Sequence, residues 1–456
     1  MEIGRRPEAW DDDTVKPSPW LVLVLVGATL GLVFAGVSTY DFVQHLDRQV
    51  HTLHCSFIPG VSHGAGESGC QVAMMSPYSS ILRSHLWGGI PISLGAMSVF
   101  AFIGFFTIDL LLTRRKSDRR ATGFLALATL LPAVTSIVML TIALTKLGTT
   151  CKLCIGIYVA SALCLVGAIV QWRSTSRGSA PPRPQPRDKR GTDPAFLGSA
   201  KQSSSSARLL EVSVDSPPAS TAFLAGAFGI GVLFVAIPVV LYLAIAPDHT
   251  HFIGTCDGLA KPEDTYNVMV QVGPSSGGAP AIEILDPLCP ACKAFEERLA
   301  ASGFEDRLDR KAMLFPLDNT CNWMVTEATH PGACTVSEAV LCAGKRAPEV
   351  IAWAFEQQDA IRDAARVRPE AAAEIVKQRF PELKECVGSP EAKSRLNKSL
   401  RWAVANGIRV LTPQLYIDNV KLCDEDVDLG LEYTLSNMLD RHDRHTLVKQ
   451  AAEKTP

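Results

Sequence analysis

Five long apolar runs set the pattern of the chain. They occupy residues 20–37, 90–112, 124–147, 153–172 and 223–246. Each run approaches the roughly 20 residues that a helix needs to cross the hydrocarbon core of a bilayer. The first run is long for the apolar part of a signal peptide, and no clear small-residue cleavage site follows it. The pattern therefore predicts five membrane-spanning helices, of which the first is retained.

Basic residues between the runs indicate which side of the membrane each loop faces. The loop between the second and third runs is strongly basic, and so is the segment after the fourth run. Short cytoplasmic loops are enriched in Lys and Arg, so both segments are expected in the cytoplasm. The N-terminus is then cytoplasmic, and the region after residue 246 is extracytoplasmic. The basic residues are Arg114, Arg115, Lys116, Arg119, Arg120, Arg173, Arg177, Arg183, Arg187, Lys189 and Arg190.

The segment between the fourth and fifth runs differs in composition from the rest of the chain. Residues 173–219 are rich in Pro, Ser, Gly and Arg. Such a segment does not bury enough apolar surface to fold, so we expect a disordered cytoplasmic linker, with a basic signalling tail as the alternative. The expected order is a cytoplasmic tail, a four-helix membrane domain, this linker, a fifth membrane helix and an extracytoplasmic domain, in residues 1–19, 20–172, 173–219, 220–246 and 247–456.

Composition narrows the class of protein. The chain has 456 residues, 47% of them apolar, and a formal net charge of -2, which gives nucleic-acid binding little support. Its 13 cysteines are more informative. In the expected topology only Cys164 lies deep in a membrane helix, where a small packing residue is common. The other cysteines face the extracytoplasmic side, where disulfides persist.

A Cys-x-x-Cys motif begins the fourth apolar run, at Cys151 and Cys154. A disulfide across so short a separation closes almost no loop, so a purely structural role has weak support. Two dithiols at the membrane face could also hold zinc or copper(I) in a sulfur cage. That alternative leaves the second Cys-x-x-Cys motif of the chain without a role.

This second motif lies in the sequence APAIEILDPLCPACKAFEERL, which predicts a short strand, a turn and an amphipathic helix. Cys289 falls at the start of the helix and Cys292 lies one turn inside it. The positive end of the helix dipole stabilises a thiolate at Cys289 and lowers its pKa. Pro290 suits the first helical turn, where a missing N–H costs nothing. A strand that leads into such a helix is a specific signal for a redox site.

The region around this motif resembles the thioredoxin-like proteins of the DsbA type. Glu283, six residues before Cys289, matches the buried acid of that family, and Thr412–Pro413 resembles its cis-proline loop, which faces the active disulfide. A long helical insertion over residues 336–405 also matches the family. The resemblance covers about residues 264–440. It alone implies the cis bond at Pro413, because most X-Pro bonds are trans.

Six further cysteines accompany this domain, and we expect them to form structural disulfides. Their spacing does not fix the connectivity. The segment CNWMVTEATHPGAC favours a bond between Cys321 and Cys334, and His330 within it is expected to be a surface residue rather than a ligand. The six are Cys256, Cys321, Cys334, Cys342, Cys386 and Cys423.

The first four apolar runs carry a second resemblance, over about residues 20–171. In CKLCIGIY, Tyr158 follows the Cys-x-x-Cys motif by one turn, and in GCQVAMMSPY, Ser76 lies six residues after Cys70. The segment GIPISLGA is similar to the start of a second helix. These features resemble the vitamin K epoxide reductase family, although Cys55 and Cys70 are farther apart than is usual there. Fusion of such a domain to a thioredoxin-like domain through a fifth helix is a known bacterial arrangement.

The two resemblances together imply a fold class and a reaction. The fold is a polytopic α-helical membrane bundle followed by an extracytoplasmic α/β thioredoxin-like domain with a helical insertion. The implied activity is that of a membrane thiol oxidase, located in the inner membrane, that makes disulfides in exported proteins. Electrons would pass from reduced exported proteins or peptides to Cys289–Cys292, then to Cys55–Cys70, then to Cys151–Cys154, and finally to a quinone.

The resemblance also implies where that quinone binds. Ubiquinone or menaquinone would lie near Cys154, with the hydroxyls of Ser76 and Tyr158 able to bond a quinone carbonyl. Without the resemblance, Tyr158 could equally be an interfacial aromatic residue. Other classes of function remain open: a reductase or isomerase that runs in the opposite direction, a metal-binding or metal-delivery protein, and a membrane-anchored binding module with purely structural cysteines.

Overall fold

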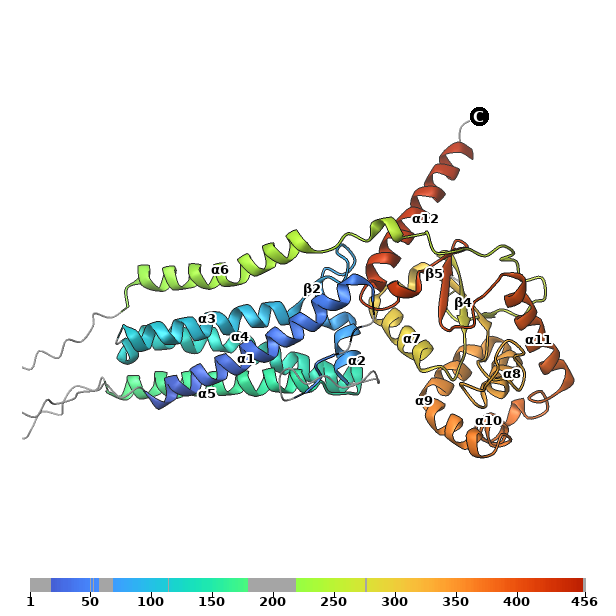
Figure 1. Ribbon diagram of the computed structural model, residues 1–456, viewed down its shortest axis with the longest axis horizontal. Helices are drawn as coiled ribbons and strands as arrows, with labels where there is room; N and C mark the ends of the chain where they lie inside the picture. The colour runs from blue at the N-terminus through green and yellow to red at the C-terminus, as the bar shows by residue number, and fades with distance from the viewer. Residues whose placement is uncertain are drawn as a thin grey trace, which may run out of the picture. The chain divides into compact units, whose positions relative to one another are not determined.

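The computed structural model describes residues 18–49, 51, 53–56, 69–113, 115–178, 219–274 and 277–453 (Figure 1). The N-terminal tail, Arg114 and most of the basic linker, on which part of the sequence analysis rests, lie outside these residues. The chain divides into two compact units. The first contains Met1–Val37, Ser56–Gly60 and Leu94–Pro238, and the second contains Ser38–Cys55, Val61–Ser93 and Val239–Pro456.

Five helices within the described residues are long and apolar enough to cross a membrane, as the sequence predicts. Only a helix or a closed barrel satisfies every backbone hydrogen bond without water, so a long isolated apolar run folds as a helix. The third run also continues through a π-helical turn, Ala143–Leu147. The helices are α1 (Pro19–Gln44), α3 (Ile92–Leu112), α4 (Arg119–Ile142), α5 (Lys152–Gly178) and α6 (Thr221–Ile245).

Helices α1, α3, α4 and α5 run alongside one another in Figure 1 and share one apolar core. Small residues let the helix backbones approach closely, as is common in membrane bundles. A Cβ added to Gly27 would lie only 2.9 Å from the sulfur of Cys164, which is fully buried between α1 and α5. Cys164 thus has the packing position that the sequence predicts. Polar contacts also join the helices, such as the hydrogen bond from Ser136 of α4 to Ser161 of α5, 2.9 Å.

The second unit includes the end of α1 and several short elements that follow it. They are α2 (Gly69–Met75), the 3₁₀ turn η2 (Pro77–Ser79), and two short strands, β1 (Ser80–Ile81) and β2 (Ile90–Pro91). The two strands pair in antiparallel fashion and form a small hairpin. This hairpin returns the chain toward α3.

The remainder of the second unit is an α/β domain. Its sheet has the order β3-β5-β4-β6-β7, in which β4 is parallel to β5 and antiparallel to β6. Helix α7 (Pro290–Ser302) connects β4 to β5, because parallel neighbours need a long crossover. This arrangement is the thioredoxin-like fold that the sequence predicts. The strands are β3 (Val270–Gln271), β4 (Ala279–Leu285), β5 (Leu308–Leu314), β6 (Gln414–Ile417) and β7 (Val420–Lys421).

A helical insertion separates β5 from β6. It contains α8 (Ala333–Ala343), α9 (Ala347–Val367), α10 (Ala371–Arg379) and α11 (Pro390–Ala405), and α12 (Leu431–Glu453) follows the sheet. The insertion shares an apolar core with Leu288 and Cys292, so the second Cys-x-x-Cys motif lies where the sheet and the insertion meet. The six expected structural cysteines form three bonds, Cys256–Cys423, Cys321–Cys334 and Cys342–Cys386. The second of these is the pair that the sequence favours.

Candidate redox sites

The CPAC motif lies at the C-terminal end of the central strand β4. Cys289 is the N-cap of α7, Pro290 is its first residue, and Cys292 follows one turn inside. Both are free thiols, and both are buried, at 4% exposed for Cys289 and 0% for Cys292. The Cys289 thiol lies 3.6 Å from the carbonyl oxygen of Thr412, and the Thr412–Pro413 bond is cis. The loop before β6 therefore faces Cys289.

The two thiols of this motif differ in acidity. A hydrogen bond with Cys292 outweighs the opposing effect of burial and lowers the pKa of Cys289 to about 6. Burial, together with the hydrogen bond to Cys289, raises the pKa of Cys292 well above its usual value. Near neutral pH, Cys289 is thus the nucleophilic thiolate and Cys292 the protonated thiol. Exchange through a mixed disulfide requires these two roles, a thiolate that attacks and a second thiol that resolves the mixed disulfide.

Glu283 lies on β4 beneath this motif and is fully buried. It forms an ion pair with Arg310 of β5, which also pairs with Glu296 and Glu305. Burial, followed by the nearby charge of Glu296, raises the pKa of Glu283, although Arg310 acts in the opposite direction. The sequence predicts a buried acid here but gives no sign of its partner.

His330 corrects an expectation of the sequence analysis. It is buried at 6% exposed, not at the surface, and its Nδ1 lies 2.7 Å from Asp286 Oδ2. Asp286 begins the turn that leads to Cys289 and accepts a hydrogen bond from the Cys289 amide at its carbonyl, 3.1 Å. The loop that carries His330 folds inward because Cys321 and Cys334 close it and the His330 amide bonds to Leu317, 3.0 Å.

The loop cysteines Cys55 and Cys70 form a disulfide. Cys70 is carried by the short helix α2, and Cys55 follows His54, which Asp41 holds through two contacts, 2.6 Å to the ring and 2.9 Å to the amide. This disulfide and the CPAC motif belong to the same compact unit. Within that unit, α7 approaches η2, just after α2, with Cα atoms within 8 Å.

Buried charged residues connect the segment just after α2 to the C-terminal helix α12. Arg83 donates to the carbonyl of Ser76, 2.8 Å, at the end of α2, and to Glu432 of α12, 3.2 Å. Gly430 provides room for Trp87, since a Cβ there would lie 2.1 Å from the indole ring. These contacts fix α2 and α12 in the second unit.

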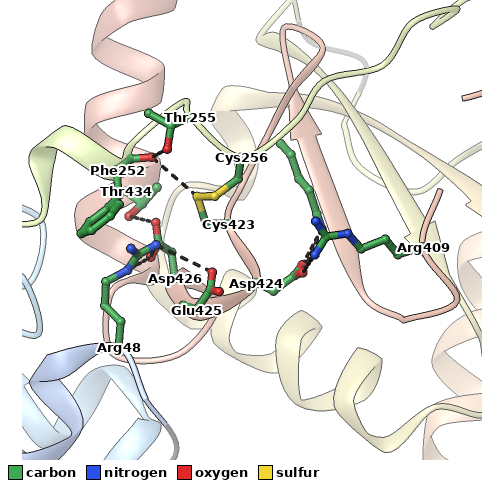
Figure 2. A network of polar contacts seen from close by, with 11 residues as sticks. Arg48, Phe252, Thr255, Cys256, Arg409, Cys423, Asp424, Glu425, Asp426 and Thr434 are labelled. Carbon is green, nitrogen blue, oxygen red and sulfur yellow. Dashed lines mark hydrogen bonds and ion pairs between the residues drawn. A yellow bond between two sulfur atoms is a disulfide. The ribbon is translucent and has the colours of Figure 1, made fainter. Parts of the chain in front are cut away.

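A second link runs through Arg48, after the end of α1. Figure 2 shows its guanidinium group directed at Asp426, 2.9 Å, with the ring of Phe252 close by. The Cys256–Cys423 disulfide lies beside this network (Figure 2). Among the described residues, the one cluster with the spacing of a metal site combines these two cysteines with Glu425. Its two sulfur atoms are bonded to each other, so this cluster does not offer two thiolate ligands.

The membrane dithiol belongs to the first unit. Cys151 lies just before α5 and Cys154 in its first turn, where the Cys154 amide lies 3.4 Å from the Cys151 sulfur. Tyr158 lies one turn farther along α5, and its hydroxyl makes a hydrogen bond with the Cys154 side chain. Ser76, the other expected quinone contact, belongs to the second unit. Its hydroxyl donates to the carbonyl of Ala73, 2.7 Å.

The chain thus carries two Cys-x-x-Cys pairs, one at a helix start of a thioredoxin-like fold and one at the start of an apolar helix, and both have the chemistry of thiol–disulfide exchange. Residues 22–169 match the profile of the Vitamin K epoxide reductase family. No curated protein matches the chain in sequence.

Two solved structures illustrate what the second unit is similar to. ScsC from Proteus mirabilis in a transitional conformation is 18% identical, with a TM-score of 0.29, and the match covers 48% of this chain and 98% of that one. The oxidoreductase DsbA from Xylella fastidiosa is 16% identical, with a TM-score of 0.27, over 39% of this chain and 92% of that one.

Several residues of these sites could not be predicted from the sequence. Arg83, Asp286 and Arg310 have no motif around them, and their partners lie far away in the sequence. Asp41 lies only 13 residues from His54 but has no motif around it either. His330 offers a weak signal, because it lies between two cysteines that are expected to bond. Such a short closed loop restricts where its side chains can point.

Proposed function

We propose that this protein is a quinone-dependent membrane thiol oxidase that forms disulfide bonds in exported proteins. Client thiols are oxidised at the CPAC pair, the electrons pass through the loop pair to the α5 pair, and ubiquinone or menaquinone accepts them. The thioredoxin-like domain lies in the periplasm and the N-terminus in the cytoplasm. The relay is Cys289–Cys292, Cys55–Cys70, Cys151–Cys154.

The asymmetry of the CPAC pair carries this proposal. With a pKa of about 6, Cys289 is a thiolate at neutral pH once the pair is reduced. Stabilising the thiolate stabilises the reduced pair relative to the disulfide, which makes the disulfide an oxidant. This acidity supports the entry of electrons from client thiols into the CPAC pair, and the turnover experiment below distinguishes the oxidase from a reductase that runs in the opposite direction.

Each step of the relay balances as a thiol–disulfide exchange. A client thiolate attacks Cys289, the Cys289–Cys292 bond breaks, and Cys292 takes the electron pair and a proton. The second client thiolate then attacks the client sulfur of the mixed disulfide, and Cys289 leaves as a thiolate. The client loses two electrons and the CPAC pair gains them. Cys289 next attacks the loop disulfide, and Cys292 resolves that mixed disulfide in the same way.

Two features of the second unit support transfer to the loop. The Cys55–Cys70 disulfide belongs to the same compact unit as the CPAC motif. Helix α7, which begins at the CPAC motif, approaches η2 just after the helix that carries Cys70. A pair of sites in one unit reacts at a high effective concentration, without the need for a diffusing partner.

The residues around Cys154 fit a quinone. A bound quinone supplies a two-electron acceptor for a dithiol. Cys154 is half-buried at the start of an apolar helix, and the Tyr158 hydroxyl beside it can donate a hydrogen bond to a carbonyl oxygen. Each of the two hydroxyls would have to exchange an existing bond to donate to the quinone, that of Tyr158 with Cys154 and that of Ser76 with Ala73.

Anaerobic turnover of the purified full chain tests the proposal. A reduced peptide serves as electron donor, and the loss of the quinone absorbance is followed with time. We expect quinone reduction by the wild type and none by Cys289→Ser with the peptide, while a small dithiol still reduces quinone through the membrane pair. Peptide reduction by added quinol would instead support the reverse activity, and tightly bound zinc or copper would support a metal-binding role.

A further inference from the structure

A buried acid–imidazole pair lies beside the CPAC motif and has no part in the relay. Asp286 is 0% exposed and His330 is 6% exposed, and their side chains lie 2.7 Å apart. They come from different segments, the turn between β4 and α7 and the loop between β5 and α8. The chain therefore brings these two titratable groups together only when this domain is folded.

Hydrogen bonds to both carboxylate oxygens and to the backbone carbonyl of Asp286 hold this residue in place. One carboxylate oxygen accepts from the Leu288 amide, 2.8 Å, and the other accepts from Leu317, 2.8 Å, as well as from His330. Its carbonyl accepts from the amide of Cys289. A negative charge is thus held in a buried site close to the nucleophilic sulfur.

Without compensation, this charge would act against the thiolate. The negative charge of Asp286 raises the pKa of Cys289, against the larger lowering effect of the bond with Cys292. Burial alone would lower the pKa of His330, but its hydrogen bond with Asp286 and the charge of that carboxylate outweigh burial and raise it. The other charged groups that face His330 are Cys289, which favours the imidazolium, and Arg362 of α9, which opposes it.

We infer that His330 is a positioning residue of the CPAC site, which offsets the charge of Asp286 and so favours the thiolate of Cys289. When Cys289 leaves a mixed disulfide, the electron pair stays on its sulfur, and the imidazolium balances the nearby carboxylate. The inference rests on the proposed function only in that both concern the same dithiol. A purely structural pair would hold the loop in place and leave the acidity of Cys289 unchanged.

Alkylation of Cys289 tests the inference without any use of quinone or client. The full chain, with the CPAC pair reduced, is treated with iodoacetamide over a range of pH, and modified Cys289 is measured by peptide mass spectrometry. In His330→Gln we expect alkylation near pH 5 to slow by about threefold to ninefold, equivalent to a rise of about half to one unit in the pKa of Cys289. Asp286→Asn should move the midpoint of the profile in the other direction.

The double variant and a matched control complete the test. In the Asp286→Asn background, His330→Gln should change the alkylation profile little, because the charge to be offset is gone. His442 forms a similar pair with Asp418, 2.6 Å, outside this site, so His442→Gln should leave Cys289 unchanged. If His330→Gln does not fold, Asp286→Asn alone decides. A Cys289 profile that stays fixed in a folded His330→Gln or Asp286→Asn protein overturns the inference, whether or not the chain reduces quinone.

Discussion

The acidity of Cys289 determines how the CPAC pair responds to pH. Its folded pKa of about 6 lies below the usual 9.0, so the thiolate stabilises the reduced folded form fully above pH 9 and this contribution is lost as pH falls through 6. Three pKa units correspond to about 4 kcal/mol. We expect the reduction of the disulfide to take up one proton per two electrons above pH 6 and two below it. Equilibration with glutathione over this pH range measures the change of slope, and a constant slope would contradict the assignment.

Cys154 lies deeper in the helix than Cys151 and is the thiol that we place next to the quinone. Cys154→Ser should abolish quinone reduction and let Cys151 accumulate in a mixed disulfide with a loop cysteine. Cys164→Ser is the matched control, because Cys164 is fully buried against Gly27 and should be replaceable without loss of turnover. Quinone absorbance and non-reducing peptide mapping give the two readouts. Full turnover by Cys154→Ser would remove this assignment.

Helix α2 is held at its C-terminal end by a charge from another part of the chain. Arg83 bonds to the last carbonyls of α2 and to Glu432 of α12. Burial lowers the pKa of Arg83 and raises that of Glu432, so each is costly without the other. Removing one partner of such a buried pair costs about 3–5 kcal/mol.

Arg83→Gln should therefore lower the thermal stability of the second unit and slow electron transfer from the CPAC pair. Quinone reduction driven by a small dithiol, which bypasses the CPAC pair, should be affected less. The ratio of the peptide-driven and dithiol-driven rates measures this effect. Arg346→Gln removes an exposed ion pair with Glu349 and Glu382 and serves as the control with an unchanged ratio. Equal losses of both rates in Arg83→Gln would argue against a role in transfer.

Helices, strands and contacts could be predicted from the sequence where residues close together in the chain determine them. Long apolar runs have no folded alternative to a helix in a membrane, and the CPAC helix begins where Pro290 and the end of an apolar strand require it. The pairing of Cys321 with Cys334 is local as well. Arg310 with Glu283, His330 with Asp286 and Arg48 with Asp426 are not, because the partner of a buried charge is chosen by the fold and not by its neighbours in sequence.

The orientation of the chain in the membrane follows from the distribution of its positive charges. The described part of the basic loop includes Arg115 and Lys116, and Arg173 lies in the last turns of α5. We expect both segments in the cytoplasm and Cys289 outside. A membrane-impermeant maleimide added to intact cells after reduction should label Cys289 and spare single cysteines introduced at Lys116 or Arg173. The opposite labelling pattern would invert the topology.

The relay requires that the thioredoxin-like domain exchange electrons with the loop of its own chain. Cys292→Ser removes the resolving thiol, so Cys289 should remain trapped in a mixed disulfide after attack on the loop. We expect Cys70 as the partner in preference to Cys55, because α7 approaches η2, which follows the helix that carries Cys70. The intramolecular bond should form at the same rate at all protein concentrations, since the effective concentration of the loop is set by the chain. Non-reducing peptide mapping identifies the bond, and Cys289→Ser in the same background is the control that should show none. A Cys289 that remains free, or that bonds only to Cys321 or another cysteine of its own domain, would falsify the relay.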